Sequence, residues 1–180
     1  MHSITFITGN QNKANYLAKY LGMEVLHEKI DTDEIQSLDL DEVVEHKVRQ
    51  AYAIAKKPIL VEDTALEFSA LGKLPGTFIK FFVQELGQEG LCRLLDGKDR
   101  SAIARTKYAY FDGTRLEIFT GELHGTIAEH PGADNGFGWD RIFIPEGYNC
   151  VRSELSEEDY KKIYLTIKPT EAVREFLLSI

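Results

Sequence analysis

Short apolar runs alternate with helix-like stripes along the first third of the chain. Within residues 10–20, apolar and aromatic side chains recur at near-helical spacing, which is typical of a helix with one buried face. The run Ile59-Leu60-Val61 is continuously apolar and predicts a short buried strand that ends in two carboxylates. In order, we expect strand 3–8, helix 10–20, strand 25–30, helix 40–55 and strand 59–61.

The second half of the chain continues this alternation and adds a β-hairpin. A loop rich in Gly and Pro leads into an aromatic helix that runs through Leu86, and the turn at residues 112–114 joins two strands. Beyond Leu86, we expect helix 88–95, strands 102–111, 115–123, 124–127 and 141–144, and closing helices 157–164 and 170–178. Strands that alternate with helices around one hairpin predict an α/β protein with a mixed β-sheet.

Length and composition fit one domain that covers residues 1–180. The chain has 180 residues, and its hydrophobic fraction of 43% is enough for a sizeable core. The formal net charge of −8 argues against a nucleic acid polymer as partner, because such binding usually needs a basic face. A small anionic substrate remains compatible with this charge if a few lysines and a metal ion handle it.

The sequence gives no indication of secretion or of a membrane anchor. Its start, Met1-His2-Ser3-Ile4, has no basic region followed by a long apolar stretch, and no apolar run is long enough to span a bilayer. The two cysteines stand far apart, and the five histidines lack the spacing of a zinc site. We therefore expect a cytoplasmic protein that does not contact a membrane.

The turn Thr8-Gly9-Asn10 between the first strand and the first helix is a candidate phosphate site. Free N–H groups at the start of a helix attract phosphate, and Lys13 adds a mobile positive charge. The spacing differs from that of the Walker loop, which is longer and ends in Lys-Ser/Thr. Judged alone, a plain strand-to-helix connection explains this turn equally well.

Glu62 and Asp63 follow the buried strand and form a second candidate. Successive side chains of a strand point to opposite faces, so only one of these carboxylates can face a given cleft. Carboxylates at such a strand end handle ligands in α/β folds, and Mg²⁺ prefers carboxylates together with phosphate oxygens. The alternative is structural, because Asp63-Thr64 also suits the N-cap of a helix.

The loop motif FGWD at residues 137–140 is a third candidate. Phe137 and Trp139 flank a glycine, and two aromatic rings beside Asp140 suit a stacked base whose polar edge is hydrogen-bonded. A loop that its aromatic residues anchor on the core is the competing interpretation. The acidic loop after the second strand most simply forms a solvated surface, although one member would serve as a second metal ligand.

Together these segments resemble the inosine triphosphate pyrophosphatase family, also called the Ham1 family of non-canonical purine nucleotide pyrophosphatases. The resemblance rests on TGNQNK (8–13), VEDTALEFSALGKLPGTFIKFF (61–82) and FGWDRIF (137–143), which occur in the family's order and at its separations. It extends from about Ile4 to Phe176 and so covers nearly the whole chain. The Maf family is similar in fold but begins with a serine- and arginine-rich motif instead.

The resemblance implies a fold, an activity and partners. The fold would be two-lobed and ITPase/Maf-like, with helices around a long central mixed β-sheet and a nucleotide-binding cleft between the lobes. The activity would be Mg²⁺-dependent hydrolysis of nucleoside triphosphates to monophosphate and pyrophosphate. The substrates would be non-canonical purine nucleotides such as ITP, dITP and XTP. The family also implies a homodimer that removes aberrant nucleotides from the pool.

The same motifs imply site residues by position. Asp63 would act as general base as well as metal ligand, and Lys13 would stabilise charge on the leaving pyrophosphate. The ligands implied for Mg²⁺ are Glu34 and Asp63. The substrate-binding residues implied are Thr8, Gly9, Asn10, Lys13, Lys47, Lys80, Phe137, Trp139, Asp140, Lys162, Thr166 and Lys168.

The last motif departs from the family. Where the family carries Ser-His-Arg in contact with the purine, this chain has Thr166, Ile167 and Lys168, and the family's preceding lysine matches either Lys161 or Lys162. Thr166 keeps a hydroxyl, but Ile167 cannot hydrogen-bond and Lys168 lacks the planar fork of arginine. Two alternatives therefore stay open: the same chemistry on a different base, or a nucleotide-binding protein with reduced turnover.

Overall fold

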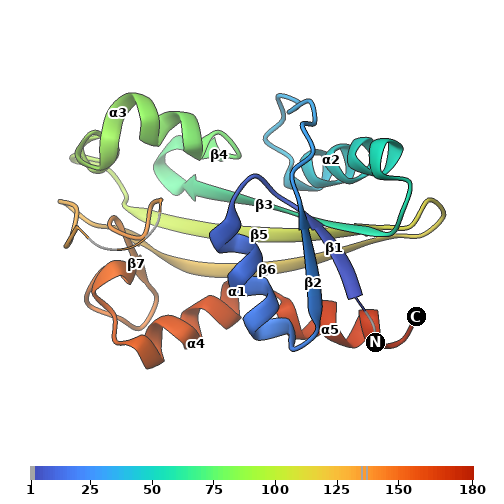
Figure 1. Ribbon diagram of the computed structural model, residues 1–180. Coiled ribbons are helices and arrows are strands. Elements are labelled where there is room, and N and C mark those ends of the chain that lie inside the picture. Colours follow the sequence, from blue (N-terminus) through green and yellow to red (C-terminus); the bar gives the residue numbers. More distant parts are fainter. Residues whose placement is uncertain (1–2, 135, 137) are drawn as a thin grey trace. The chain divides into compact units, whose positions relative to one another are not determined.

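The computed structural model describes residues 3–134, 136 and 138–180 and has an α/β fold, as predicted (Figure 1). Its strands are β1 (Ser3–Ile7), β2 (Glu24–Glu28), β3 (Ile59–Phe68), β4 (Pro75–Gly76), β5 (Ser101–Phe111), β6 (Leu116–Ile127) and β7 (Phe143–Pro145). Its α-helices are α1 (Gln11–Leu21), α2 (Leu40–Ala55), α3 (Ile79–Arg93), α4 (Glu157–Ile167) and α5 (Thr170–Leu178). Within the described residues, no helix is both long and apolar enough to cross a membrane.

The described strands form a seven-stranded mixed sheet. Its order is β2-β1-β3-β5-β6-β7, and the short β4 pairs with β3 outside this path. Strand β1 runs parallel to both β2 and β3, whereas β6 and β7 are antiparallel. The expectation of a mixed sheet is therefore confirmed.

The chain divides into two compact units, each assembled from discontinuous segments. The first unit comprises the residues up to Asp63 together with Thr106–Thr120 and Lys168–Ile180. The second unit comprises Thr64–Arg105 and Gly121–Ile167. Strands β3, β5 and β6 each contribute residues to both units. That residues 1–180 act as one domain stays a prediction.

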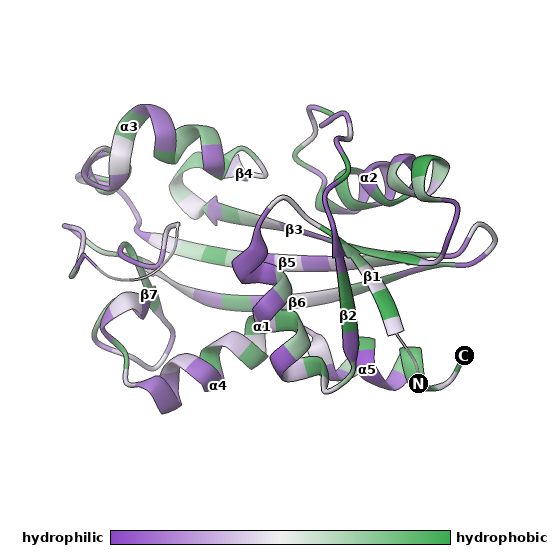
Figure 2. Cartoon of the chain, viewed as in Figure 1, coloured by the Kyte–Doolittle hydropathy of each residue, from purple (hydrophilic) through white to green (hydrophobic). Residues whose placement is uncertain are grey.

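In the first unit, helices cover both faces of the strands. Helices α1 and α5 share one face, where Leu17 and Val173 belong to the same buried cluster as Leu60. Helix α2 lies on the other face (Figure 1), and its Tyr52 ring meets Phe111 edge-on with centroids 5.0 Å apart. Figure 2 shows apolar and polar segments alternating along α1 and α2, as expected for helices with one buried face.

In the second unit, α3 and α4 share one hydrophobic core with β3, β5 and β6. Phe68 of β3 and Leu91 of α3 are fully buried in this core. The guanidinium of Arg100 links the end of α3 to the end of β6, because it donates to main-chain carbonyl oxygens at both places. The four acceptors are the carbonyl oxygens of Cys92, Leu95, Ile127 and Ala128.

Several strand boundaries differ from the sequence predictions. Strand β3 does not end at Val61 but continues through the two carboxylates to Phe68, and its residues Leu66 and Glu67 pair with β4. Asp63-Thr64 therefore lies inside a strand, and its alternative interpretation as a helix cap is wrong. Strand β6 is continuous where two strands were expected, and β7 begins two residues later than predicted.

Helix α3 contains the break that the sequence predicted. The sequence indicated one helix through Leu86 and another from residue 88, and the backbone of Gly87 between them is non-helical, with φ 65° and ψ 178°. Such a conformation is essentially restricted to glycine. The two predicted helices are therefore the two arms of α3.

Candidate active site

The turn between β1 and α1 is held by its own side chains. The hydroxyl oxygen of Thr8 accepts from the N–H of Asn10 at 3.1 Å. The side-chain oxygen of Asn10 accepts from the N–H groups of Asn12 and Lys13 at 3.0 and 3.4 Å, which makes Asn10 the N-cap of α1. A Cβ added at Gly9 would meet nothing within 4 Å, so packing inside the protein does not require a glycine here.

The strand register brings Glu62 to the end of β1. Ile7, the last residue of β1, pairs with Val61, so Glu62 is the first residue of β3 beyond this pairing. Lys13 in the first turn of α1 lies with its Nζ 3.0 Å from Oε1 of Glu62. The Nζ of Lys168 donates to the same oxygen at 2.7 Å.

The two lysines keep this buried carboxylate charged. Only 2% of the Glu62 side chain is exposed, and burial alone would raise its pKa. Attraction and hydrogen bonds from Lys13 and Lys168 outweigh burial and hold the pKa of Glu62 well below its ordinary value. Burial likewise lowers the pKa of Lys13, but attraction to Glu62 and Asp63 prevails and raises it. Glu62 and Lys13 are therefore both charged near neutral pH.

Asp63 is engaged from the other side of the strand, as the alternation of side chains predicts. Its Oδ2 lies 3.1 Å from Nζ of Lys47 on α2, and Lys47 also donates to the carbonyl oxygen of Glu62 at 3.3 Å. Helix α2 and helix α1 cover opposite faces of the first unit (Figure 1). The side chains of Lys47 and Asp63 are 22% and 26% exposed, so both are accessible to a ligand from solvent.

Glu34 lies exposed in the loop that precedes α2. This loop is tied to α2, because the N–H of Asp33 donates to the Gln50 side chain at 2.8 Å and Gln50 donates back to the Asp33 carboxylate at 3.3 Å. Among the residues that the structure describes, no three His, Cys, Asp or Glu side chains gather as a complete metal cluster. The roles of Glu34 and Asp63 as metal ligands stay predictions, although carboxylate oxygens are the ligands that Mg²⁺ prefers together with phosphate.

Three further candidate residues lie on helices of the second unit. Lys80 is exposed on α3, with its Nζ 5.9 Å from the centroid of the Phe81 ring. Lys162 is exposed on α4, as is its neighbour Lys161. Thr166 is also exposed, and its hydroxyl donates to the carbonyl oxygen of Lys162 at 3.0 Å. These positions leave the predicted roles of the three side chains untested.

The FGWD loop is built around a buried ion pair. Asp140 accepts from Nη1 of Arg152 at 2.9 Å and from the hydroxyl of Tyr160 at 3.0 Å. The guanidinium carbon of Arg152 lies 5.1 Å from the ring centroids of both Trp139 and Tyr160. These contacts favour the interpretation of an anchored loop for Asp140. Phe137, predicted to stack on a base, lies outside the described residues.

Sequence reasoning missed several of these partners. Glu62 was noticed as part of the acidic pair, but its ion pairs with two lysines were not predicted. Nothing in the local sequence around Arg152 or Tyr160 signals that both engage Asp140. Lys168 was predicted to face a base, whereas in the structure its ammonium group bonds Glu62.

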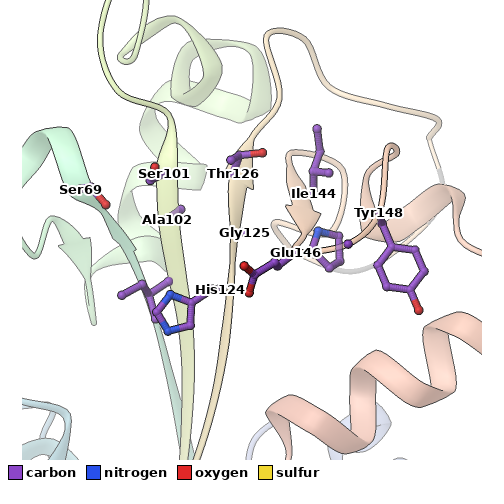
Figure 3. A pocket seen from close by; sticks show the side chains of 12 residues that line it. Ser69, Ser101, Ala102, His124, Gly125, Thr126, Ile144, Glu146 and Tyr148 are labelled. Atoms are coloured by element: carbon purple, nitrogen blue, oxygen red, sulfur yellow. The ribbon is translucent and has the colours of Figure 1, made fainter.

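A cavity of about 420 Å³ lies on the sheet of the second unit (Figure 3). Its lining includes His124, Thr126 and Glu146, together with Ser101 and Tyr148. Within the part of the chain that the structure describes, none of the residues predicted from the sequence to bind substrate or metal lines this cavity. The candidate active site is therefore the group of lysines and carboxylates in the first unit.

The similarity of this chain to known proteins identifies its family. The sequence profile of the Ham1 family matches residues 4–176, which is nearly the whole chain. The chain belongs to the Ham1 family. An inosine triphosphate pyrophosphatase from Yarrowia lipolytica is 40% identical over 181 residues, covering 97% of this chain and 95% of the relative. Inosine triphosphate pyrophosphatase 2 from Trypanosoma cruzi is 39% identical over 178 residues, covering 96% and 91%.

Solved structures of this family share the fold. A HAM1 protein from Coxiella burnetii matches with a TM-score of 0.86 at 23% identity over 100% of both chains. A nucleoside-triphosphatase described as a dITP/XTP pyrophosphatase, from Mycobacterium abscessus, matches with a TM-score of 0.78 at 22% identity over 95% of this chain and 98% of that one. At such identities the likeness concerns the fold, and the predicted Ham1-type fold is confirmed.

Proposed function

We propose that this Ham1-family protein is a nucleoside triphosphate pyrophosphatase that hydrolyses non-canonical purine nucleotides, such as ITP, dITP and XTP. The products are the monophosphate and pyrophosphate, and the biological task is to clear aberrant nucleotides from the pool. The observation that carries the proposal is the lysine–carboxylate group of the first unit, formed by Lys13, Lys47 and Lys168 around Glu62 and Asp63. The names of the curated relatives support the same activity.

The opening turn and its lysine suit the binding of a triphosphate. The start of α1 carries the positive end of the helix dipole, and Lys13 adds a full charge in the first turn. Gly9 has no side chain, and those of Thr8 and Asn10 are short, so an anion can come close to this turn. Lys47 on α2 adds a second cation to the same unit.

The acidic side chains suit a metal-assisted hydrolysis. A divalent cation, which we take to be Mg²⁺, would be held by Glu34 and Asp63 and would neutralise phosphate charge and polarise the reacting groups. In this proposal Asp63 accepts a proton from the attacking water, and the 3.1 Å contact with Lys47 supports this role because it would hold the carboxylate in position. Lys13 stabilises the negative charge that develops on the departing pyrophosphate.

The identity of the base depends on residues whose roles stay predictions. Lys80, Lys162, Trp139, Asp140 and Thr166 lie in the second unit, and Asp140 is already engaged by two side chains. The same chemistry on a different base therefore remains the second candidate function, and the replacement of the family's Ser-His-Arg favours it. A homodimer and a cytoplasmic location are part of the proposal.

The proposal predicts that Asp63→Asn removes turnover but not the fold. Loss of the general base is expected to lower kcat by about 10²–10⁴-fold, because the asparagine amide cannot accept the proton from water. The measurement is pyrophosphate release with Mg²⁺ from ITP, XTP, GTP, dUTP and dTTP, together with the melting temperature of each variant. Asp96→Asn serves as control, since Asp96 is 67% exposed and paired only at 3.7 Å with Arg100.

The outcomes separate the candidates. Near-normal turnover in Asp63→Asn would show that Asp63 is not the base. No pyrophosphate from any triphosphate in the unmodified protein would remove the enzyme proposal and favour a nucleotide-binding protein. Release with a preference for dUTP or dTTP would keep the chemistry and replace the substrate.

A further inference from the structure

By the resemblance, Lys168 would stand where the family's arginine contacts the purine, and in the structure its ammonium group lies beside a carboxylate. Its Nζ lies 2.7 Å from Oε1 of Glu62, 106 residues earlier in the chain. The Lys168 side chain is 13% exposed and the Glu62 side chain 2%, so the pair is largely shielded from solvent. Both residues belong to the first unit, as do the other members of the group.

Two lysines converge on one oxygen of this carboxylate. Lys13 lies 3.0 Å from the same Oε1 that Lys168 binds. One buried carboxylate thus holds two ammonium groups. The pair of Lys47 and Asp63 adds one charge of each sign to the group. Two ammonium groups beside a helix N-terminus favour a phosphate chain over an uncharged base.

The residues before Lys168 do not form an edge that reads a base. Ile167 is buried, with 1% of its surface exposed, and has no hydrogen-bonding group. The hydroxyl of Thr166 donates back into its own helix, to the carbonyl oxygen of Lys162. The stretch that replaces Ser-His-Arg therefore presents an apolar residue, a hydroxyl engaged by its helix and a lysine committed to Glu62.

We propose that Lys168 is a positioning residue for the phosphate side of the reaction, acting through Glu62, and that it does not select the base. When Lys13 turns toward the triphosphate, Lys168 remains on Glu62 and keeps that buried carboxylate paired. Lys13 is therefore free to move without leaving an isolated buried charge behind. This inference rests on the proposed function, in which Lys13 binds the triphosphate.

The test compares Lys168→Met, Lys168→Arg and the control Lys19→Met, which removes a charge from an exposed position of α1. Calorimetric titration with pyrophosphate and Mg²⁺ measures the phosphate site without turnover. We expect Lys168→Met to weaken pyrophosphate binding by about tenfold, and Lys168→Arg and Lys19→Met to remain within about twofold of the unmodified protein. Melting temperatures establish that each variant is folded.

Kinetics with ITP, XTP and GTP supply the second readout. A phosphate-side role predicts that Lys168→Met lowers kcat/KM by the same factor for all three nucleotides. It also predicts that Lys168→Arg leaves their ratios unchanged within about twofold. This arginine variant decides the question even if Lys168→Met does not fold, because an arginine that reads the base would shift the ratios toward ITP and XTP.

Three results would overturn the inference: base-dependent losses in Lys168→Met, altered substrate ratios in Lys168→Arg, or an unmodified protein that does not bind pyrophosphate. Failure of the proposed function looks different. In that case the unmodified protein hydrolyses no triphosphate, while the titrations still report whether Lys168 controls the phosphate site.

Discussion

Asp140 and Arg152 place opposite charges in an almost dry environment, with only 4% and 6% of their side chains exposed. The hydroxyl of Tyr160 also donates to the carboxylate, at 3.0 Å. Removing one partner of a buried pair leaves an isolated charge, which is much more destabilising than the loss of a surface pair. This pair therefore supports the fold of the second unit whether or not Asp140 also contacts a base.

We expect Asp140→Asn to lower the free energy of unfolding by about 3–5 kcal/mol, because Arg152 would remain buried without its counter-charge. Urea denaturation followed by circular dichroism measures this value. The matched control is Asp134→Asn, whose partner Arg141 lies at 2.9 Å but whose side chain is 93% exposed. The control is expected to lose about 0–1 kcal/mol. Equal losses in the two variants would contradict a buried, structurally important pair.

For individual residues, the sequence predicted which side chains belong to the site better than it predicted the partners that they contact. Lys13, Lys47 and Asp63 were predicted to act together, and the structure places them in one unit around β3. The contact between Lys168 and Glu62 was not predictable, because it depends on how a chain segment 106 residues away packs. A motif match assigns a residue to a position, whereas its partner follows from packing in this particular chain.

Helix α3 shows how one backbone conformation can divide an element. Gly87 has φ 65° and ψ 178° in the middle of α3, a region that residues with a Cβ avoid. A Cβ added there would meet nothing within 4 Å, so any effect of a substitution comes from backbone strain and not from a clash. The two arms of the helix owe their separate directions to this residue.

Gly87→Ala is expected to destabilise the protein by about 1–3 kcal/mol through strain alone. Differential scanning fluorimetry and chemical denaturation measure the change. Glu85→Ala, an exposed substitution in the same helix, is the control and is expected to stay within about 0.5 kcal/mol. A neutral Gly87→Ala would mean that the backbone relaxes to a helical conformation at this position.

Elements were predictable wherever the local pattern was sufficient. The bounds of α2 match the prediction because Asp39 caps its first turn and an apolar stripe runs through its length. The extent of β3 was not predictable, since Glu62, Asp63 and Thr64 interrupt the apolar pattern. Lysines from other elements neutralise the two carboxylates, and this compensation lets the strand continue.

The whole molecule is joined by strands that its two units share. Strands β3, β5 and β6 each have residues in both units, so neither unit can unfold without breaking strands that continue into the other. We expect a single cooperative thermal transition, with a ratio of calorimetric to van't Hoff enthalpy of about 1. Two resolved transitions in a calorimetric scan would show that the units unfold independently.

The charge of the molecule as a whole does not reveal the charges gathered at its site. The net charge is −8, yet three lysines lie around Glu62 and Asp63 in the candidate active site. Composition therefore gave no information about the lysines that the fold gathers at this site, and the absence of a nucleic acid polymer as partner stays a prediction. Local charge, set by the fold, is what a small anion experiences at short range.

The turn at the start of α1 is held by its own hydrogen bonds, and this determines when its backbone becomes ordered. Because Thr8 and Asn10 already satisfy backbone N–H groups of the turn, its conformational freedom is lost during folding and not on the arrival of a ligand. The entropy lost on binding then falls mainly on the flexible triphosphate. The Asn10 side-chain oxygen meanwhile already accepts hydrogen bonds from the N–H groups to which an anion would bind. An incoming phosphate must either displace this oxygen or settle beside it.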